Sequence, residues 1–219
     1  MYQAVLFDLD GTLLNTLADL HAGVNHALAA HSLPLRTEEQ TKAAVGNGVR
    51  RLIMQSVPAQ TPPALTEAVL RDFRAYYAAH SRVCTAPYPG ILPLLNALSA
   101  EGRQIAIVSN KFDAAVKDIS SYFFGGLVPV AIGEAEERGI RKKPAPDTVL
   151  EAMKQLHVQP SDAVYIGDSE VDIETARAAA LPCISVTWGF RSEQQLREAG
   201  ATLLIRTASE LAALLGVTI

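Results

Sequence analysis

Short runs of apolar residues recur along this sequence and alternate with longer segments that have helical periodicity. The clearest runs occupy residues 4–7, 104–108 and 163–166. Continuous apolar runs of this length are typical of strands that are buried on both faces inside a parallel sheet. Weaker runs predict three further strands, at residues 127–132, 183–187 and 203–205.

Helices are predicted between these runs from apolar residues spaced three and four positions apart. In the first of them, Leu17, Leu20 and Val24 follow Asn15 and Thr16, either of which could cap the helix. A capping box, Thr37-Glu38-Glu39-Gln40, opens the second. The other predicted helices span residues 49–57, 64–79, about 90–100, 113–122, 146–156, 172–180, 192–199 and 209–215.

The order of these elements predicts an interrupted α/β domain. Residues 15–82 contain helical patterns and no convincing strand, whereas strands and helices alternate from about residue 86 onward. Such alternation favours a parallel sheet covered by helices on both faces. We therefore expect a core of residues 1–14 and 83–219, and an inserted helical cap of residues 15–82 above the ends of the strands.

Composition limits the classes of function. The 219 residues carry a net charge of −4, with a pI near 5.7, and 49% are hydrophobic. The sequence has no basic stripe of the kind that would indicate nucleic acid as a partner. Cys84 and Cys183 lack metal-site spacing and are expected to be reduced thiols. No targeting segment or bilayer-spanning stretch is recognisable, so we expect no membrane partner and a cytoplasmic location, as a monomer or homodimer.

Polar side chains stand where three of the apolar runs end. Asp8 and Asp10 follow the first run, Ser109 the second and Asp168 the third. Ligands bind at the carboxyl ends of the strands in open parallel sheets, so these groups could converge on one spot. Alternation along a strand lets Asp8 and Asp10 point the same way, and burying two carboxylates together is costly unless a cation or proton intervenes. The pattern indicates a hard cation with an anionic ligand.

Four motifs occur in order along the chain: Asp8-Leu9-Asp10-Gly11-Thr12-Leu13, Ser109-Asn110, Lys143-Pro144 and Gly167-Asp168-Ser169-Glu170-Val171-Asp172. Taken together they resemble the motifs of the haloacid dehalogenase-like hydrolases, and the resemblance covers essentially the whole chain. It implies a Rossmann-like core, Mg²⁺ as cofactor and an aspartyl-phosphate intermediate.

The resemblance implies a role for each of the charged residues. Asp8 is the expected nucleophile, Asp10 the general acid and base, and Lys143 the cation that neutralises Asp8 and the phosphoryl group. The expected metal ligands are Asp8, the backbone carbonyl of Asp10, and Asp168, since Mg²⁺ prefers oxygen donors. Asp172 either holds a metal-bound water, orients a neighbour or only caps a helix.

Three more residues are expected to bind the substrate's phosphoryl group. The Ser109 hydroxyl and nearby amides resemble the phosphate-binding group of the family, and Asn110 follows directly. Thr12 adds a second hydroxyl beside the two carboxylates.

Segments of the insertion resemble the cap of phosphoglycolate phosphatase-like members of the family, as does Trp188-Gly189-Phe190-Arg191 in the core. In such a cap the amides of Gly46, Asn47 and Gly48, together with Arg50, could receive a small carboxylate. The same residues could equally form a tight turn with an exposed arginine. Asn15 departs from the aspartate that is common in this subgroup.

The sequence thus predicts a Mg²⁺-dependent phosphomonoester hydrolase that acts on a small anionic metabolite, with 2-phosphoglycolate as the first choice. Relatives with similar caps act on pyrophosphate and sugar phosphates, and a phosphosugar mutase would use the same aspartyl phosphate. His21 is the only residue that favours the mutase. A non-catalytic binding module would be expected to lose one of Asp8, Asp10, Lys143 or Asp168, and all four are present.

Overall fold

The computed structural model describes residues 2–219 and divides into two compact units. The first unit contains the chain up to Leu14 together with Pro87–Ile219, and the second contains Asn15–Ala86. The sequence pattern predicts boundaries after residues 14 and 82, and the compact units divide after residues 14 and 86.

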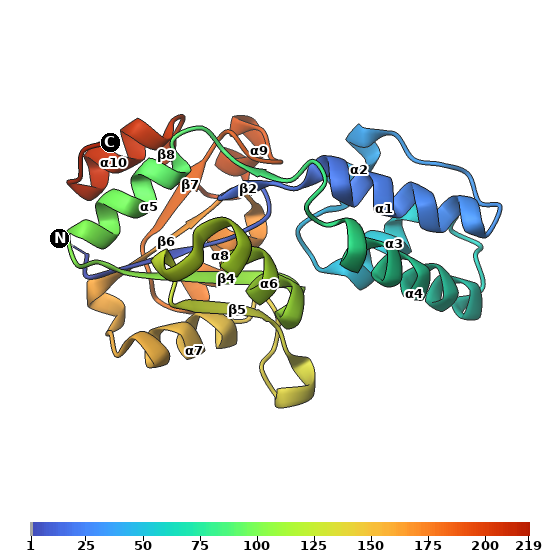
Figure 1. Cartoon of the computed structure of the whole chain (residues 1–219), viewed down its shortest axis with the longest axis horizontal. Coiled ribbons are helices and arrows are strands. Elements are labelled where there is room, and N and C mark those ends of the chain that lie inside the picture. The colour runs from blue at the N-terminus through green and yellow to red at the C-terminus, as the bar shows by residue number, and fades with distance from the viewer. Residues whose placement is uncertain (1) are drawn as a thin grey trace. The chain divides into compact units, whose positions relative to one another are not determined.

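The first unit is built on a six-stranded sheet with the strand order β5-β4-β1-β6-β7-β8 (Figure 1). Every neighbouring pair is parallel, which confirms the predicted α/β class. The first strand of the chain, β1, is paired on both sides, with Phe7 opposite Ile107 of β4 and Ile166 of β6. The strands are β1 (Ala4–Phe7), β4 (Gln104–Phe112), β5 (Val130–Glu134), β6 (Ala163–Gly167), β7 (Cys183–Val186) and β8 (Leu204–Ile205).

Side chains of β1 alternate between two cores, one on each face of the sheet. Val5 and Phe7 face one core, and Ala4 and Leu6 face the other. The first core is closed by α5 (Ile91–Ala100), α6 (Asp113–Phe124) and α10 (Ala208–Leu215), the second by α7 (Asp147–Leu156) and α8 (Glu170–Ala178). Figure 1 shows α5 and α10 on the opposite side of the sheet from α7. All four residues of β1 are therefore buried, as their apolar character predicts.

Short elements complete the first unit. Helix α9 (Glu193–Glu198) begins after Ser192, whose side chain caps it. Three single turns of 3₁₀ helix are η1 (Gly125–Leu127), η2 (Glu136–Arg138) and η3 (Pro160–Asp162). At the junctions with the second unit, β2 (Leu14–Asn15) and β3 (Ala86–Pro87) form a two-stranded sheet.

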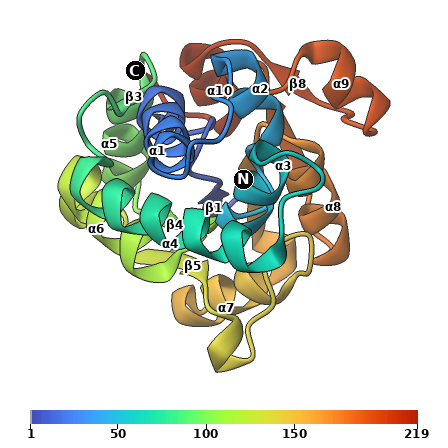
Figure 2. The same cartoon turned by 90° about the vertical axis from the view of Figure 1, so that its right-hand side faces the viewer.

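The second unit is helical, as predicted. It contains α1 (Leu17–Ala30), α2 (Glu38–Ala44), α3 (Val49–Ser56) and α4 (Pro63–His80). Helices α1 and α4 pack side by side (Figures 1 and 2), with Val24 and Phe73 fully buried.

Helix starts in this unit follow the sequence signals in part. The capping box of α2 is present, because Thr37 Oγ1 accepts from the Gln40 amide and the Gln40 side chain accepts from the Thr37 amide. Thr16 occupies the N-cap of α1, but its side chain makes no capping bond. The Asn15 carboxamide accepts from the Leu17 amide instead, at 3.3 Å.

A buried carboxylate joins the two ends of the helical unit. Asp19 accepts hydrogen bonds from the amides of Cys84 and Thr85 and from the Thr85 hydroxyl, the last at 2.7 Å. Hydrogen bonds to an ionised group are the stronger kind, so this aspartate fixes the start of α1 against the chain's return from α4.

Neither cysteine forms a disulfide, and Cys84 is exposed while Cys183 is half-buried. Among residues 2–219, no helix combines the length and the apolar character that crossing a bilayer requires.

Candidate active site

Asp8 is the first residue after β1, at the centre of the sheet. Its amide donates to the Ile166 carbonyl at 2.8 Å, so the backbone continues the ladder between β1 and β6 for one more residue. Its side chain is buried, with the whole residue 6% exposed. The strand therefore places a carboxylate where it is shielded from water, and a buried carboxylate needs charged or hydrogen-bonding partners.

Lys143 is the principal partner of Asp8. Its ammonium donates to Asp8 Oδ1 at 2.6 Å, to Asp172 Oδ1 at 2.7 Å and to the Tyr165 hydroxyl at 3.0 Å. The Tyr165 hydroxyl in turn donates to Asp172 Oδ1 at 3.0 Å. One buried cation thus uses its three donors on a closed network and holds two carboxylates together.

Asp172 is fixed by the start of α8. Ser169 is the N-cap, and Asp172 closes a capping box by accepting from the Ser169 amide at 3.1 Å and hydroxyl at 2.6 Å. The predicted start of this helix at residue 172 is therefore wrong, because α8 begins at Glu170. Asp172 occupies the third helical position, not the N-cap, and points its other oxygen at Lys143.

Asp168 follows β6 and is held from two sides. Its Oδ1 accepts from the Thr12 hydroxyl at 3.3 Å, and its Oδ2 accepts from the Phe190 amide at 2.6 Å. Trp188 adds a brace, because its indole N–H donates to the Thr12 carbonyl at 3.0 Å. The loop after β7 therefore helps to orient the carboxylate that follows β6.

Three glycines leave room for these carboxylates. A Cβ on Gly167 would lie 2.6 Å from Asp172 Oδ2 and closer still to Asp172 Cγ. A Cβ on Gly11, whose φ is +96°, would lie 2.8 Å from Asp168 Cγ, and one on Gly189 would also collide with Asp168. A side chain at any of these positions would displace a carboxylate.

Burial dominates the electrostatics of the cluster. It raises the pKa of Asp8 well above its ordinary value; Lys143 opposes the rise, and Asp172 and Asp168 add to it. Burial and the charge of Asp172 raise the pKa of Asp168 to about 7, against the Phe190 amide. Burial alone would lower the pKa of Lys143, but Asp172 and Asp8 outweigh it and raise that pKa. The ammonium of Lys143 therefore stays charged, but its charge does not fully offset the effect of burial on the pKa of Asp8.

The donor set fits a hard divalent cation. Oxygen atoms of Asp8, Asp168 and Asp172 lie within 4.8 Å of one another, and all three residues are buried. Three carboxylates less one ammonium leave two negative charges, which a divalent cation would balance. Mg²⁺ prefers oxygen ligands and is bound by few carboxylates, so the residues present suit it.

Asp10 is paired with a different cation, Lys111. Lys111 Nζ donates to Asp10 Oδ1 at 2.7 Å, and both side chains are largely buried. Asp8 and Asp10 are therefore each paired with a different lysine. Ser109, two residues before Lys111, is buried, and its Oγ accepts from the Lys111 amide at 3.2 Å.

Asn110 fastens the loop that carries Lys143. Its Nδ2 donates to the Lys143 carbonyl at 3.0 Å and its Oδ1 accepts from the Lys143 amide at 2.8 Å. The second and third motifs are thereby joined at the backbone, which gives Asn110 a positioning task. Its predicted contact with substrate stays a prediction.

The predicted cap residues lie in the helical unit, in and after a turn. Gly46 and Gly48 have positive φ values of +125° and +84°, and Gly48 is the N-cap of α3. Arg50 forms a two-pronged ion pair with Glu67, one arm of which measures 3.1 Å. Both charged groups are about half exposed, so the pair is open to exchange with another carboxylate.

Several contributors lie outside the four motifs or were given no role by them. Lys111 follows Ser109-Asn110 directly, so its place on the end of β4 was visible in the sequence, but its partner was not. Tyr165 lies inside an apolar run, where nothing distinguishes it from a core residue. Phe190 contributes through its backbone amide, which no side-chain pattern reveals.

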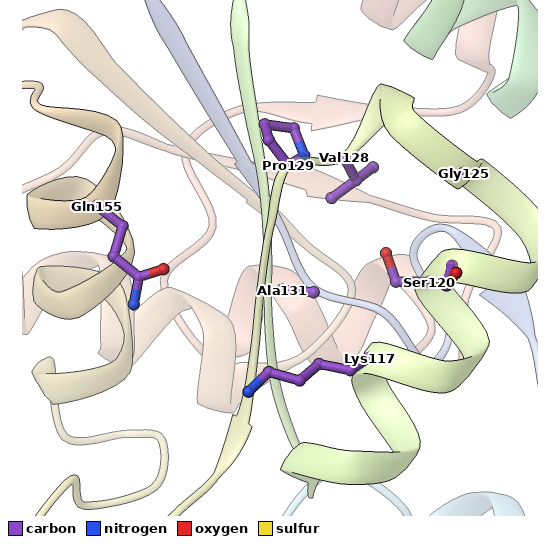
Figure 3. A pocket seen from close by; sticks show the side chains of 8 residues that line it. Lys117, Ser120, Gly125, Val128, Pro129, Ala131 and Gln155 are labelled. Carbon is purple, nitrogen blue, oxygen red and sulfur yellow. The ribbon is translucent and has the colours of Figure 1, made fainter.

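A separate cavity of about 240 Å³ lies against the edge strand β5. Figure 3 shows Gln155 of α7 and Lys117 of α6 on opposite sides of β5, with Ala131 between them. None of its lining residues is one of the predicted site residues.

Comparison with known proteins places these features in context. Residues 5–186 match the family model of haloacid dehalogenase-like hydrolases. Phosphoglycolate phosphatase 1 of Pseudomonas aeruginosa is 32% identical over 222 aligned residues, covering 94% of this chain and 77% of that protein. The N-acetylmuramic acid 6-phosphate phosphatase of the same organism is 31% identical, covering 95% and 92%.

Solved structures agree with this relationship. A crystal structure of a protein from Lactobacillus delbrueckii subsp. bulgaricus matches this chain with a TM-score of 0.90 at 38% identity. The match covers 97% of this chain and 98% of that one.

The close fit around Asp172 generates a prediction. Gly167→Ala should lower the free energy of unfolding by about 1–3 kcal/mol, because the new methyl group must displace a carboxylate pinned by Lys143 and Ser169. Gly126→Ala is the matched control, since a Cβ there meets nothing within 4 Å. Urea denaturation followed by circular dichroism measures both. A Gly167→Ala protein as stable as the Gly126→Ala control would show that Asp172 is not held as described.

Proposed function

This chain belongs to the haloacid dehalogenase-like hydrolases, and from that premise we propose that it is a Mg²⁺-dependent phosphomonoester hydrolase. It acts through an aspartyl-phosphate intermediate on a small anionic metabolite. The observation that carries the proposal is Asp8 at the end of the central strand, bonded to Lys143 beside two further buried carboxylates.

Asp8 is the nucleophile. A carboxylate attacks phosphorus only when ionised, and burial works against ionisation here. The Lys143 ammonium at 2.6 Å counters that effect and would also face the negative charge of an incoming phosphoryl group. Asp172 and Tyr165 hold the ammonium in place, so they act on Asp8 through Lys143.

Asp10 is the general acid for the leaving oxygen and then the general base for water. Its Lys111 pair uses Oδ1, and within residues 2–219 its Oδ2 accepts no hydrogen bond. That second oxygen is the one suited to exchange a proton with the leaving group. Its pairing with Lys111, where Asp8 is paired with Lys143, supports different roles for the two carboxylates.

Asp8 and Asp168, with the Asp10 carbonyl, would hold Mg²⁺, and Asp172 would orient Lys143 or a metal-bound water. When bound, the cation would supply positive charge that balances the carboxylates and the phosphoryl oxygens. Thr12 and Phe190 support this by fixing both oxygens of Asp168. The side chains of Ser109, Thr12 and Asn110 would donate hydrogen bonds to the phosphoryl oxygens.

The substrate we propose is 2-phosphoglycolate. The phosphatases of Pseudomonas aeruginosa described above are named for phosphoglycolate and for N-acetylmuramic acid 6-phosphate. Both compounds join a phosphomonoester to a carboxylate. In this chain the amides of Gly46, Asn47 and Gly48 and the guanidinium of Arg50 would receive that carboxylate. Conversion of a phosphosugar by a mutase remains the nearest alternative, and sugar phosphate or pyrophosphate hydrolysis follows it.

The partner is a small phosphorylated metabolite, with neither nucleic acid nor membrane as ligand. We expect a cytoplasmic monomer or homodimer.

The nucleophile is tested by Asp8→Asn. Phosphate release should fall by at least about a thousandfold, because an amide cannot attack phosphorus. The fold should persist, since Asn is of the same size and removes a charge from a crowded cluster. Asp118→Asn, an exposed acid on α6, is the control and should keep full activity. Turnover in the Asp8→Asn protein comparable to that of the control would refute the mechanism.

The carboxylate site is tested by Arg50→Gln. For 2-phosphoglycolate, KM should rise by about 10–100-fold, the equivalent of one or two charge-assisted hydrogen bonds. For p-nitrophenyl phosphate, which has no carboxylate, KM should stay the same. Arg51→Gln is the matched neighbour and should change neither value. An equal rise for both substrates would mean that Arg50 does not recognise a carboxylate. A panel that includes glucose 1-phosphate, assayed for isomerisation as well as phosphate release, tests the mutase alternative.

A further inference from the structure

The pairing of Lys111 with Asp10 goes beyond the four motifs. Lys111 lies near the carboxyl end of β4, and Asp10 follows the end of β1, the adjacent parallel strand whose Phe7 is opposite Ile107 of β4. Their side chains meet at 2.7 Å, with Lys111 3% and Asp10 14% exposed. A buried lysine needs a charged partner, and this one is directed at a proposed catalytic carboxylate.

Lys111 is held by a strand and not by a loop. Strand β4 runs to Phe112, beyond the predicted end at residue 108, and its register with β5 shifts between Val108 and Phe112. Irregularities of this kind re-aim side chains near functional sites. The Lys111 amide is further fixed by the Ser109 hydroxyl at 3.2 Å.

Asp10, by contrast, lies in a tight turn. The Leu9 carbonyl accepts from the amides of Leu13 and Leu14, and the Gly11 amide donates to the Leu14 carbonyl. No hydrogen bond to the Asp10 side chain comes from within this turn among residues 2–219. The bond from Lys111 is therefore what fixes the rotamer of Asp10.

We propose that Lys111 is a positioning residue for the acid–base step: it anchors Asp10 through Oδ1 so that Oδ2 faces the leaving oxygen. The inference rests on the proposed function, because it assigns a task within that reaction. It distinguishes the two lysines of the site, since Lys143 acts on the nucleophile and Lys111 acts through the acid.

A residue that acts through the general acid matters most when the leaving group needs a proton. Phenyl phosphate releases a basic phenolate, whereas p-nitrophenyl phosphate releases an anion that departs readily without protonation. The ratio of kcat/KM for the two esters, measured on one sample, is independent of how much of that sample is folded. It therefore separates positioning of Asp10 from a loss of stability.

The test measures this ratio in Lys111→Met and Lys111→Gln. The value for phenyl phosphate should fall at least about tenfold, a part of the roughly 10²–10⁴-fold that general acid catalysis supplies, while that for p-nitrophenyl phosphate should change less than about threefold. Lys111→Arg, which keeps the charge and a donor, should recover part of the loss. Lys117→Met, on the exposed face of α6, is the control and should leave the ratio unchanged.

A double-mutant cycle completes the test. In the Asp10→Asn background, Lys111→Met should cost less than about threefold with phenyl phosphate, because the residue through which it acts has gone. Equal losses for both esters, or an undiminished loss in the Asp10→Asn background, would overturn the inference and point to binding of the phosphoryl group. Failure of the wild-type protein to hydrolyse either ester would instead overturn the proposed function and the inference with it.

Discussion

The ammonium of Lys143, shared between Asp8 and Asp172, is the interaction on which the site depends. Desolvation of an unpaired ion costs several kcal/mol, and the ammonium offsets part of that cost for both buried carboxylates. Two further residues hold the lysine in place: Tyr165 accepts from its ammonium, and Asn110 bonds to its backbone. Since one cation cannot balance three carboxylates, the network is complete as a scaffold but short of positive charge.

The parallel sheet explains why these groups meet. The carboxyl ends of the parallel strands β1, β4 and β6 lie at the same edge of the sheet, so segments more than 100 positions apart in sequence become neighbours. The glycines at positions 11, 167 and 189 then allow the carboxylates to sit closer to the backbone than any side chain would permit. Chemistry and fold are linked here by the same residues, because enlarging any of these glycines would disturb both.

Much of this could be predicted from the sequence, for identifiable reasons. Apolar runs and helical spacing report burial directly, so the sheet, the helical insertion and the strand ends bearing Asp8 and Asp168 were accessible. Pairings across the fold were not. The sequence placed Lys111 beside Ser109 but could not show that it reaches Asp10, and it offered Asn110 as a phosphate ligand without revealing its bonds to Lys143. The sequence left three roles open for Asp172, and only the structure shows its position, which the capping box with Ser169 fixes.

The claim that the buried carboxylates form a cation site is tested most directly by titrating the protein with Mg²⁺ in a calorimeter. One ion per chain should bind to the wild-type protein. In Asp168→Asn, affinity should fall by at least about tenfold while circular dichroism shows an intact fold, because one of the oxygen donors has lost its charge. Absence of binding to the wild-type protein, or unchanged affinity in Asp168→Asn, would contradict the account.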